Sequence, residues 1–203
     1  MSKPAEMYVC VHAPEFPAQA LLRLRPELRE QPCVVMEGEP PLQQVCSLTK
    51  KTRRLGLVRG MTQVEVDTFS GVTALRRSRN QETSARADLL ECAGGFSPRV
   101  EDRSEEGAFL CVVDIAGTTA LFGPPETLVQ SLLARVRALG ITACDCSISS
   151  GRYHQVPCAS QSVLTTTKFH PLGVPMAAVL HVRGFSFLEF RSRTAFSFSG
   201  VRG

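Results

Sequence analysis

The sequence predicts an α+β fold in which a split βαβ sheet carries an inserted helical lobe. Short apolar runs with strand character are interspersed with segments that place apolar residues at helical spacing. A stretch rich in glycine, proline and basic residues interrupts this series at about 38–76. The composition, 43% apolar and 21% charged over 203 residues, is typical of a globular protein.

The first predicted helix lies between two short strands. Met7–Val11 is apolar throughout, which indicates a buried strand. The following helix starts near Pro17 and stops near Pro26, because proline lacks the N–H that continues a helix. Cys33–Met36 is the second predicted strand, and a turn-rich break follows it.

The inserted segment begins with an extended stretch at Gln44–Ser47 and a basic stretch at Lys50–Arg54. A short helix is expected from Thr62 to Phe69. Thr62 is its predicted N-cap, since Glu65 stands three residues later, at the spacing of a capping box. A strand is expected at Val72–Leu75.

The second half of the predicted sheet alternates helix and strand. A helix is expected over 80–93, and Phe109–Ile115 predicts a strand buried on both faces because its apolar run is nearly continuous. Glu126–Leu139 is an amphipathic helix that stops before a glycine, and Ile141–Ile148 is the last strand.

Beyond residue 150 no sustained period remains. Residues 151–203 therefore predict an irregular C-terminal tail: a short hairpin, a poorly ordered end, or a sequence that has lost its original continuation.

Charge and composition exclude some classes of protein. No apolar run is long enough to cross a bilayer, so no membrane partner is expected. The eight cysteines contain no CxxC pair, and structural zinc requires four ligands, so no zinc site is predicted. The net charge of +4 permits nucleic-acid binding without requiring it.

Four segments, in chain order, carry recognisable motifs. They are VHAPEFPAQ at 11–19, with 25–28 and 32–35 after it; 45–61, which includes TRRLGLVRGM; FSPRVE at 96–101, leading to VDI at 113–115; and LFG at 121–123. Together they resemble the catalytic core of Y-family (UmuC-like) DNA polymerases, and most of all its ImuB-like non-catalytic branch. The resemblance implies one palm-and-fingers domain over 7–150. Its palm would be ferredoxin-like, its small helical fingers lobe would span about 38–76, and the chain would be truncated after the palm.

The same resemblance bears on catalysis. Templated nucleotidyl transfer uses two divalent metal ions held by carboxylates on adjacent strands. The resemblance places those carboxylates at His12, near Pro14, and at Phe109 and Leu110. None of these residues supplies a carboxylate. We therefore expect no polymerase activity, no catalytic residue, no bound metal and no cofactor.

Other carboxylates are displaced from these positions. Asp114 is expected to accept backbone hydrogen bonds near Gly117, and the acidic stretch 101–106 is expected to form a solvated turn between strands. Mg²⁺ would bind only under the alternative in which Glu15, Glu101 and Asp114 converge on a metal.

The candidate ligands for nucleotide or DNA phosphate lie in the segment that resembles the fingers. Phosphate contacts require only positive charge and reach, so they can persist after catalysis is lost. The alternative is an exposed basic helix without a ligand. Arg76, Arg77 and Arg79 are expected to be ordinary surface charges, the alternative being that they extend this surface. The candidates are Lys50, Lys51, Arg53, Arg54 and Arg59.

The resemblance implies a non-catalytic accessory protein of DNA repair, translesion synthesis and SOS mutagenesis, located in the bacterial cytoplasm at the nucleoid. Its expected partners are damaged or primer-template DNA, an error-prone replicative-type polymerase and the sliding clamp. The little-finger domain and tail that carry most clamp contacts in the family have no counterpart here, which weakens the clamp expectation. Two alternatives remain: an active error-prone lesion-bypass polymerase, and an inactive truncated remnant.

Overall fold

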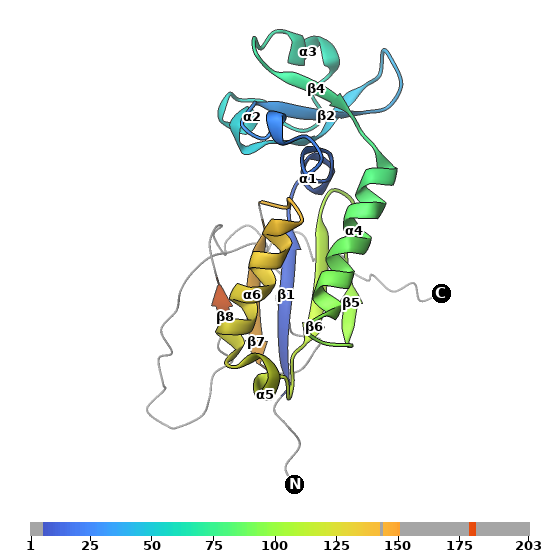
Figure 1. Cartoon of the computed structure of the whole chain (residues 1–203). Helices are drawn as coiled ribbons and strands as arrows, with labels where there is room; N and C mark the ends of the chain where they lie inside the picture. The colour runs from blue at the N-terminus through green and yellow to red at the C-terminus, as the bar shows by residue number, and fades with distance from the viewer. Residues whose placement is uncertain (1–5, 143, 151–178, 182–203) are drawn as a thin grey trace, which may run out of the picture.

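The computed structural model describes residues 6–142, 144–150 and 179–181, and it confirms the α+β class. A five-stranded sheet and a three-stranded sheet form two lobes that lie end to end (Figure 1). The tail predicted as irregular, 151–203, lies outside the described residues except for β8 (Val179–His181). Within the described residues, no helix has the length and apolarity that a membrane crossing requires.

The large sheet is built around β1 (Met7–Ala13). Strands β6 (Phe109–Asp114) and β7 (Asp145–Ser150) pair with it on either side, both antiparallel, so they run parallel to each other. Helix α6 (Pro125–Ala138) connects them and completes the predicted split βαβ unit. The full order is β5-β6-β1-β7-β8, and β5 spans Val100–Asp102.

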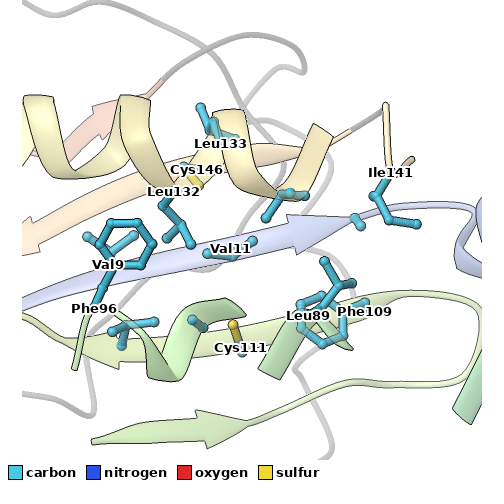
Figure 2. Packing of buried hydrophobic residues seen from close by; sticks show 14 of the residues in the cluster. Val9, Val11, Leu89, Phe96, Phe109, Cys111, Leu132, Leu133, Ile141 and Cys146 are labelled. Carbon is cyan, nitrogen blue, oxygen red and sulfur yellow. The ribbon is translucent and has the colours of Figure 1, made fainter. Parts of the chain in front are cut away.

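The main core lies between this sheet and two helices, α4 (Arg79–Gly94) and α6 (Figures 1 and 2). Val9 and Val11 of β1 face the helices together with Cys111 of β6. Each fully buried aliphatic side chain of this kind contributes about 1.5–3 kcal/mol. On β6 the alternate residue Val112 is buried as well, which confirms that this strand is covered on both faces.

The small lobe (residues 33–76) has its own sheet. Its strands are β2 (Cys33–Glu37), β3 (Gln44–Leu48) and β4 (Thr73–Arg76), in the order β3-β2-β4. It also contains the short helices α2 (Lys50–Arg54) and α3 (Gln63–Asp67).

The small-lobe sheet corrects the placement of one strand. The sequence order suggested that 33–36 belongs to the same sheet as β1, but β2 pairs only with β3 and β4 among the described strands. An apolar run specifies burial and not a pairing partner, so the sequence pattern could not distinguish the two sheets.

Helix α1 (Phe16–Leu22) lies between the two lobes (Figure 1). All seven of its residues are buried, and it contacts α4 as well as β2 and β3. Two further short elements, η1 (Pro26–Leu28) and α5 (Thr119–Phe122), complete the described helices. A helix this short is stable only through its packing, so the two lobes hold α1 in place.

The residues predicted to begin α3 and to end α6 have those roles in the structure. The Thr62 hydroxyl accepts the Glu65 N–H while the Glu65 carboxylate accepts the Thr62 N–H, which is the predicted capping box. Helix α6 ends before Gly140, whose φ is +87°. A Cβ at Gly140 would lie 2.9 Å from the Arg23 Cβ, so only glycine permits this close approach.

Candidate functional site

Strands β1 and β6 bring together the positions at which the resemblance places metal-binding carboxylates. His12 lies directly opposite Leu110, and Ala13 lies opposite Phe109. Pro14 follows at the end of β1, where its carbonyl oxygen accepts a hydrogen bond of 2.7 Å from Gln19 Nε2. We call His12, Pro14, Phe109 and Leu110 the strand floor.

The strand floor does not fit a magnesium ion. Magnesium requires oxygen ligands in octahedral geometry, and the side chains here are an imidazole, a pyrrolidine ring, a phenyl ring and an isobutyl group. Phe109 is fully buried, and its ring centroid lies 5.6 Å from that of Phe16. Among the described residues, no three His, Cys, Asp or Glu side chains are grouped as metal ligands.

The carboxylates considered as replacements do not converge on the floor. Asp114 pairs with Tyr8 in the sheet, four residues from His12 and so roughly 13 Å along the strand. Its carboxylate accepts the Ala116 N–H at 2.9 Å and pairs with Arg99 at 2.7 Å, which confirms the predicted structural role. Glu101 pairs with Arg103 at 3.0 Å.

His12 is held in its neutral form. Burial lowers the pKa of its imidazole, and the nearby carboxylate of Glu105 opposes this effect only in part. Its Nδ1 atom is buried and has no hydrogen-bond partner. Burial at this position therefore disfavours a positive charge on the His12 imidazole.

We predict that His12 makes the stability of the protein depend on pH. Its folded pKa is below the ordinary value of about 6.5, so the unfolded chain binds the proton more tightly and stability falls as the pH drops through that value. Urea midpoints of the parent should fall from about pH 8 to about pH 5, and those of His12→Leu should fall less. The variant should be no less stable than the parent at about pH 8, because it removes an unpaired buried nitrogen. Equal pH dependence in both proteins would refute this assignment.

The five candidate phosphate ligands fall into two groups. Lys50 and Arg54, the first and last residues of α2, are exposed and have no ion-pair partner in the described part of the chain. Lys51 pairs with Glu30 at 2.7 Å and also donates to the Glu30 carbonyl oxygen. Arg53 and Arg59 both pair with Glu15, at 2.5 Å and 2.9 Å.

The pairing of Glu15 with two of the candidate cations was not predicted from the sequence. It is the residue before α1, and its φ of 50° and ψ of 41° place it in the left-handed region. Its carboxylate also accepts hydrogen bonds from the Ser47 hydroxyl at 2.8 Å and the Leu48 N–H at 3.1 Å. No local pattern predicts these contacts, because the partners lie 32 and 33 residues away in the chain.

Arg77 is not an ordinary surface charge, contrary to the expectation from the sequence. Its guanidinium forms two parallel hydrogen bonds with Glu82, at 2.7 Å and 2.8 Å, and its side chain is only 6% exposed. It also reaches Glu37 of β2 at 2.7 Å and Glu106 in the β5–β6 turn at 3.2 Å. Arg77 therefore links the small lobe to the large sheet.

Arg79 and the acidic turn extend the same cluster. Arg79 pairs with Glu37 at 2.5 Å and with Glu106 at 2.9 Å. Hydrogen bonds from Arg79 and Arg77 hold the pKa of the Glu106 carboxyl below its usual value. The stretch 101–106 forms the end of β5 and the turn before β6, as expected, but Glu106 serves as an ion-pair partner.

We predict that Arg77→Met destabilises the protein by about 2–3 kcal/mol, because it leaves partly buried carboxylates without their partner. Arg76→Met is the matched control: among the described residues Arg76 pairs only with Glu39, and the two side chains are 74% and 78% exposed. Loss of such a pair costs less than about 1 kcal/mol. Chemical denaturation measures both values. Equal losses in the two variants would contradict the role of Arg77 as a link between lobes.

Residues 11–154, about seven tenths of the chain, match the model of the impB/mucB/samB family. The chain belongs to this family, and its described part has the core fold of the Y-family polymerases. No curated protein matches the sequence significantly.

Solved structures show the same fold. DinB from Sulfolobus solfataricus aligns with a TM-score of 0.59 and 15% identity over 70% of this chain and 41% of its own. An insertion ternary complex of Dbh DNA polymerase has a TM-score of 0.59 and 14% identity, covering 78% of this chain and 44% of that one. A Y-family DNA polymerase chimera of Dbh and Dpo4 aligns with a TM-score of 0.59 and 15% identity, over 70% of this chain and 42% of that one. The chain thus spans about two fifths of the length of these structures.

Proposed function

We propose that this protein is a non-catalytic, Y-family polymerase-like accessory protein of DNA repair, acting in translesion synthesis and damage-induced mutagenesis. The observation that carries the proposal is the strand floor. The positions His12 and Leu110 meet across β1 and β6, as a metal site would require, yet the floor contains no carboxylate.

The chemistry of phosphoryl transfer explains why this loss is decisive. The protein contributes to that reaction almost entirely by positioning and by electrostatic stabilisation, and the metal ions neutralise the charge that develops. A single missing carboxylate can be replaced by water. A floor with no carboxylate, packed by Phe109 against Phe16, offers no place for the ions.

The proposed role requires contact with DNA, and the exposed cations of α2 support it. Lys50 and Arg54 face solvent at the two ends of this helix, where phosphate oxygens can reach them. We propose damaged or primer-template DNA as the ligand, with an error-prone replicative-type polymerase and the sliding clamp as further partners, in the bacterial cytoplasm at the nucleoid. Two of the similar structures are ternary and binary complexes of a DNA polymerase.

We expect no nucleotide incorporation in a primer-extension assay with Mg²⁺ or Mn²⁺, because no described group of residues fits the metal ions. A Y-family polymerase with an intact metal site provides the positive control. Incorporation that rises with protein concentration and disappears in Glu101→Ala would contradict the proposal and support an active polymerase. Glu101 is a suitable probe because its carboxylate is half exposed and pairs only with Arg103 among the described residues.

DNA binding is tested with a matched pair of charge reversals. Arg54→Glu should lower the affinity for primer-template DNA several-fold and reduce the salt slope by about one, as loss of one phosphate contact predicts. Arg137→Glu is the control, since Arg137 is also exposed and lies in the last turn of α6 on the other lobe. Both variants change the net charge equally. If they weaken binding to the same degree, α2 does not form the DNA-binding surface.

A further inference from the structure

The large sheet has a second apolar face, opposite the face on which α4 and α6 pack (Figure 1). Side chains alternate along a strand, and Val9 and Cys111 belong to the core beneath these helices. The neighbouring side chains of Tyr8, Cys10 and Val112 therefore point to the other side of the sheet. These three residues are 8%, 2% and 1% exposed, so the second face is buried as well.

The register of the sheet extends the second face over three strands. Cys10 lies opposite Val112 of β6 and opposite Ser147 of β7. Tyr8 lies opposite Ser149, and the two serines are 8% and 7% exposed. Strand side chains stand roughly perpendicular to their sheet, so the strands alone do not cover this face. The described helices that pack on the large sheet, α4 and α6, both lie on the first face.

Strand β8 brings the chain back to the edge of this sheet. It pairs with β7, and its last residue, His181, lies opposite Ser147. The backbone at this point is level with Cys10 and two strand spacings from β1, or roughly 10 Å. Residues 182–203 follow directly and lie outside the described residues. A stretch of this length can reach roughly 70 Å when extended, whereas five strands span only about 20 Å.

The stretch 182–203 has the composition of a segment that covers an apolar surface. It contains five of the eleven phenylalanines of the chain, and Glu189 is its only acidic residue. Phe185-Ser186-Phe187 and Phe196-Ser197-Phe198 repeat one alternation, which in an extended chain places both rings of a triplet on the same side. A phenylalanine buries roughly 150–250 Å², so five in water would expose a larger apolar patch than monomeric proteins usually carry.

We infer that residues 182–203 dock on the second face of the large sheet, with the phenylalanines of the two Phe-Ser-Phe triplets over Tyr8, Cys10 and Val112. The occupant is this segment of the chain itself, because β8 places its start at the edge of the face. The docked segment makes this face unavailable to nucleic acid and to partner proteins. The inference goes beyond the proposed function, because it requires neither DNA binding nor the absence of catalysis.

The first test uses fluorescence of the full chain. The sequence contains no tryptophan, so Phe187→Trp introduces a single indole into the segment. We expect acrylamide to quench this indole at least about threefold less than it quenches N-acetyltryptophanamide, because close packing excludes the quencher. The emission should also lie at shorter wavelength than that of the same variant in urea. Quenching equal to that of the free compound, in a folded protein, would overturn the inference.

A matched pair of substitutions shows which surface protects the indole. Leu110 is partly buried and alternates with Cys111 on β6, so its side chain lies on the second face. Leu42 is 80% exposed and lies in the small lobe. In the Phe187→Trp background, Leu110→Lys should raise quenching to about the level in urea, and Leu42→Lys should leave it unchanged. Equal effects of the two substitutions would overturn the inference.

Photo-cross-linking separates docking within one chain from docking of a second copy, and it introduces no charge. Leu110 is replaced by p-benzoylphenylalanine in the full chain, and the linked peptides are identified by mass spectrometry. We expect links to peptides from 182–203 in the band of monomer mass. Links in a band of dimer mass, links to other peptides only, or no link would overturn the inference.

The same replacement at Leu121 is the control for the cross-linking, because this residue is 81% exposed and lies in α5. It should give no links to 182–203, and a yield equal to that from Leu110 would overturn the inference. None of these measurements involves nucleotides or DNA, so their failure would leave the proposed function standing.

Discussion

The carboxylate of Glu15 joins the two lobes, because it lies where β1 turns into α1, accepts hydrogen bonds from β3 and α2, and forms an ion pair with Arg59 in the loop that follows α2. Helix α1 leaves the large sheet in the direction that this turn permits, and both lobes pack against it. Arg77 forms a second link at the other side of the small lobe, between β2, α4 and the β5–β6 turn. The relative placement of the two sheets thus depends on two clusters of partly buried charge.

The strand floor keeps its sheet register without any carboxylate side chain. Strands β1 and β6 keep the antiparallel register that brings His12 opposite Leu110. Pairing of this kind depends on backbone hydrogen bonds and on core packing, so side chains at the floor can change without loss of the sheet. Here Phe109 continues the core through the floor and contacts Phe16.

The basic residues of the small lobe illustrate why charge along a sequence is a weak guide to a binding surface. Five cations within ten positions looked alike, yet three of them form ion pairs inside the protein. The carboxylate partners, Glu15 and Glu30, lie in a different part of the chain. Of these five, only Lys50 and Arg54 have no ion pair among the described residues, which is why Arg54 is the residue chosen for charge reversal.

The sequence by itself determined the α+β class, most helix and strand positions, the Thr62 capping box and the absence of carboxylates at the floor. These features depend on residues that are near one another in the chain or on the chemical identity of single residues. Tertiary structure alone decided that β2 joins the small-lobe sheet, that Arg77 is buried, and that Glu15 pairs with Arg53 and Arg59. Each of these depends on contacts between residues far apart in the chain: Cys33 and Thr73 in the small-lobe sheet and Arg77 and Glu37 are 40 residues apart, and Glu15 and Arg53 are 38 apart. The same apolar run or charge could have been paired or exposed elsewhere. The type of a residue limits which partners it can bind, and the tertiary structure determines which of those partners lie within contact distance.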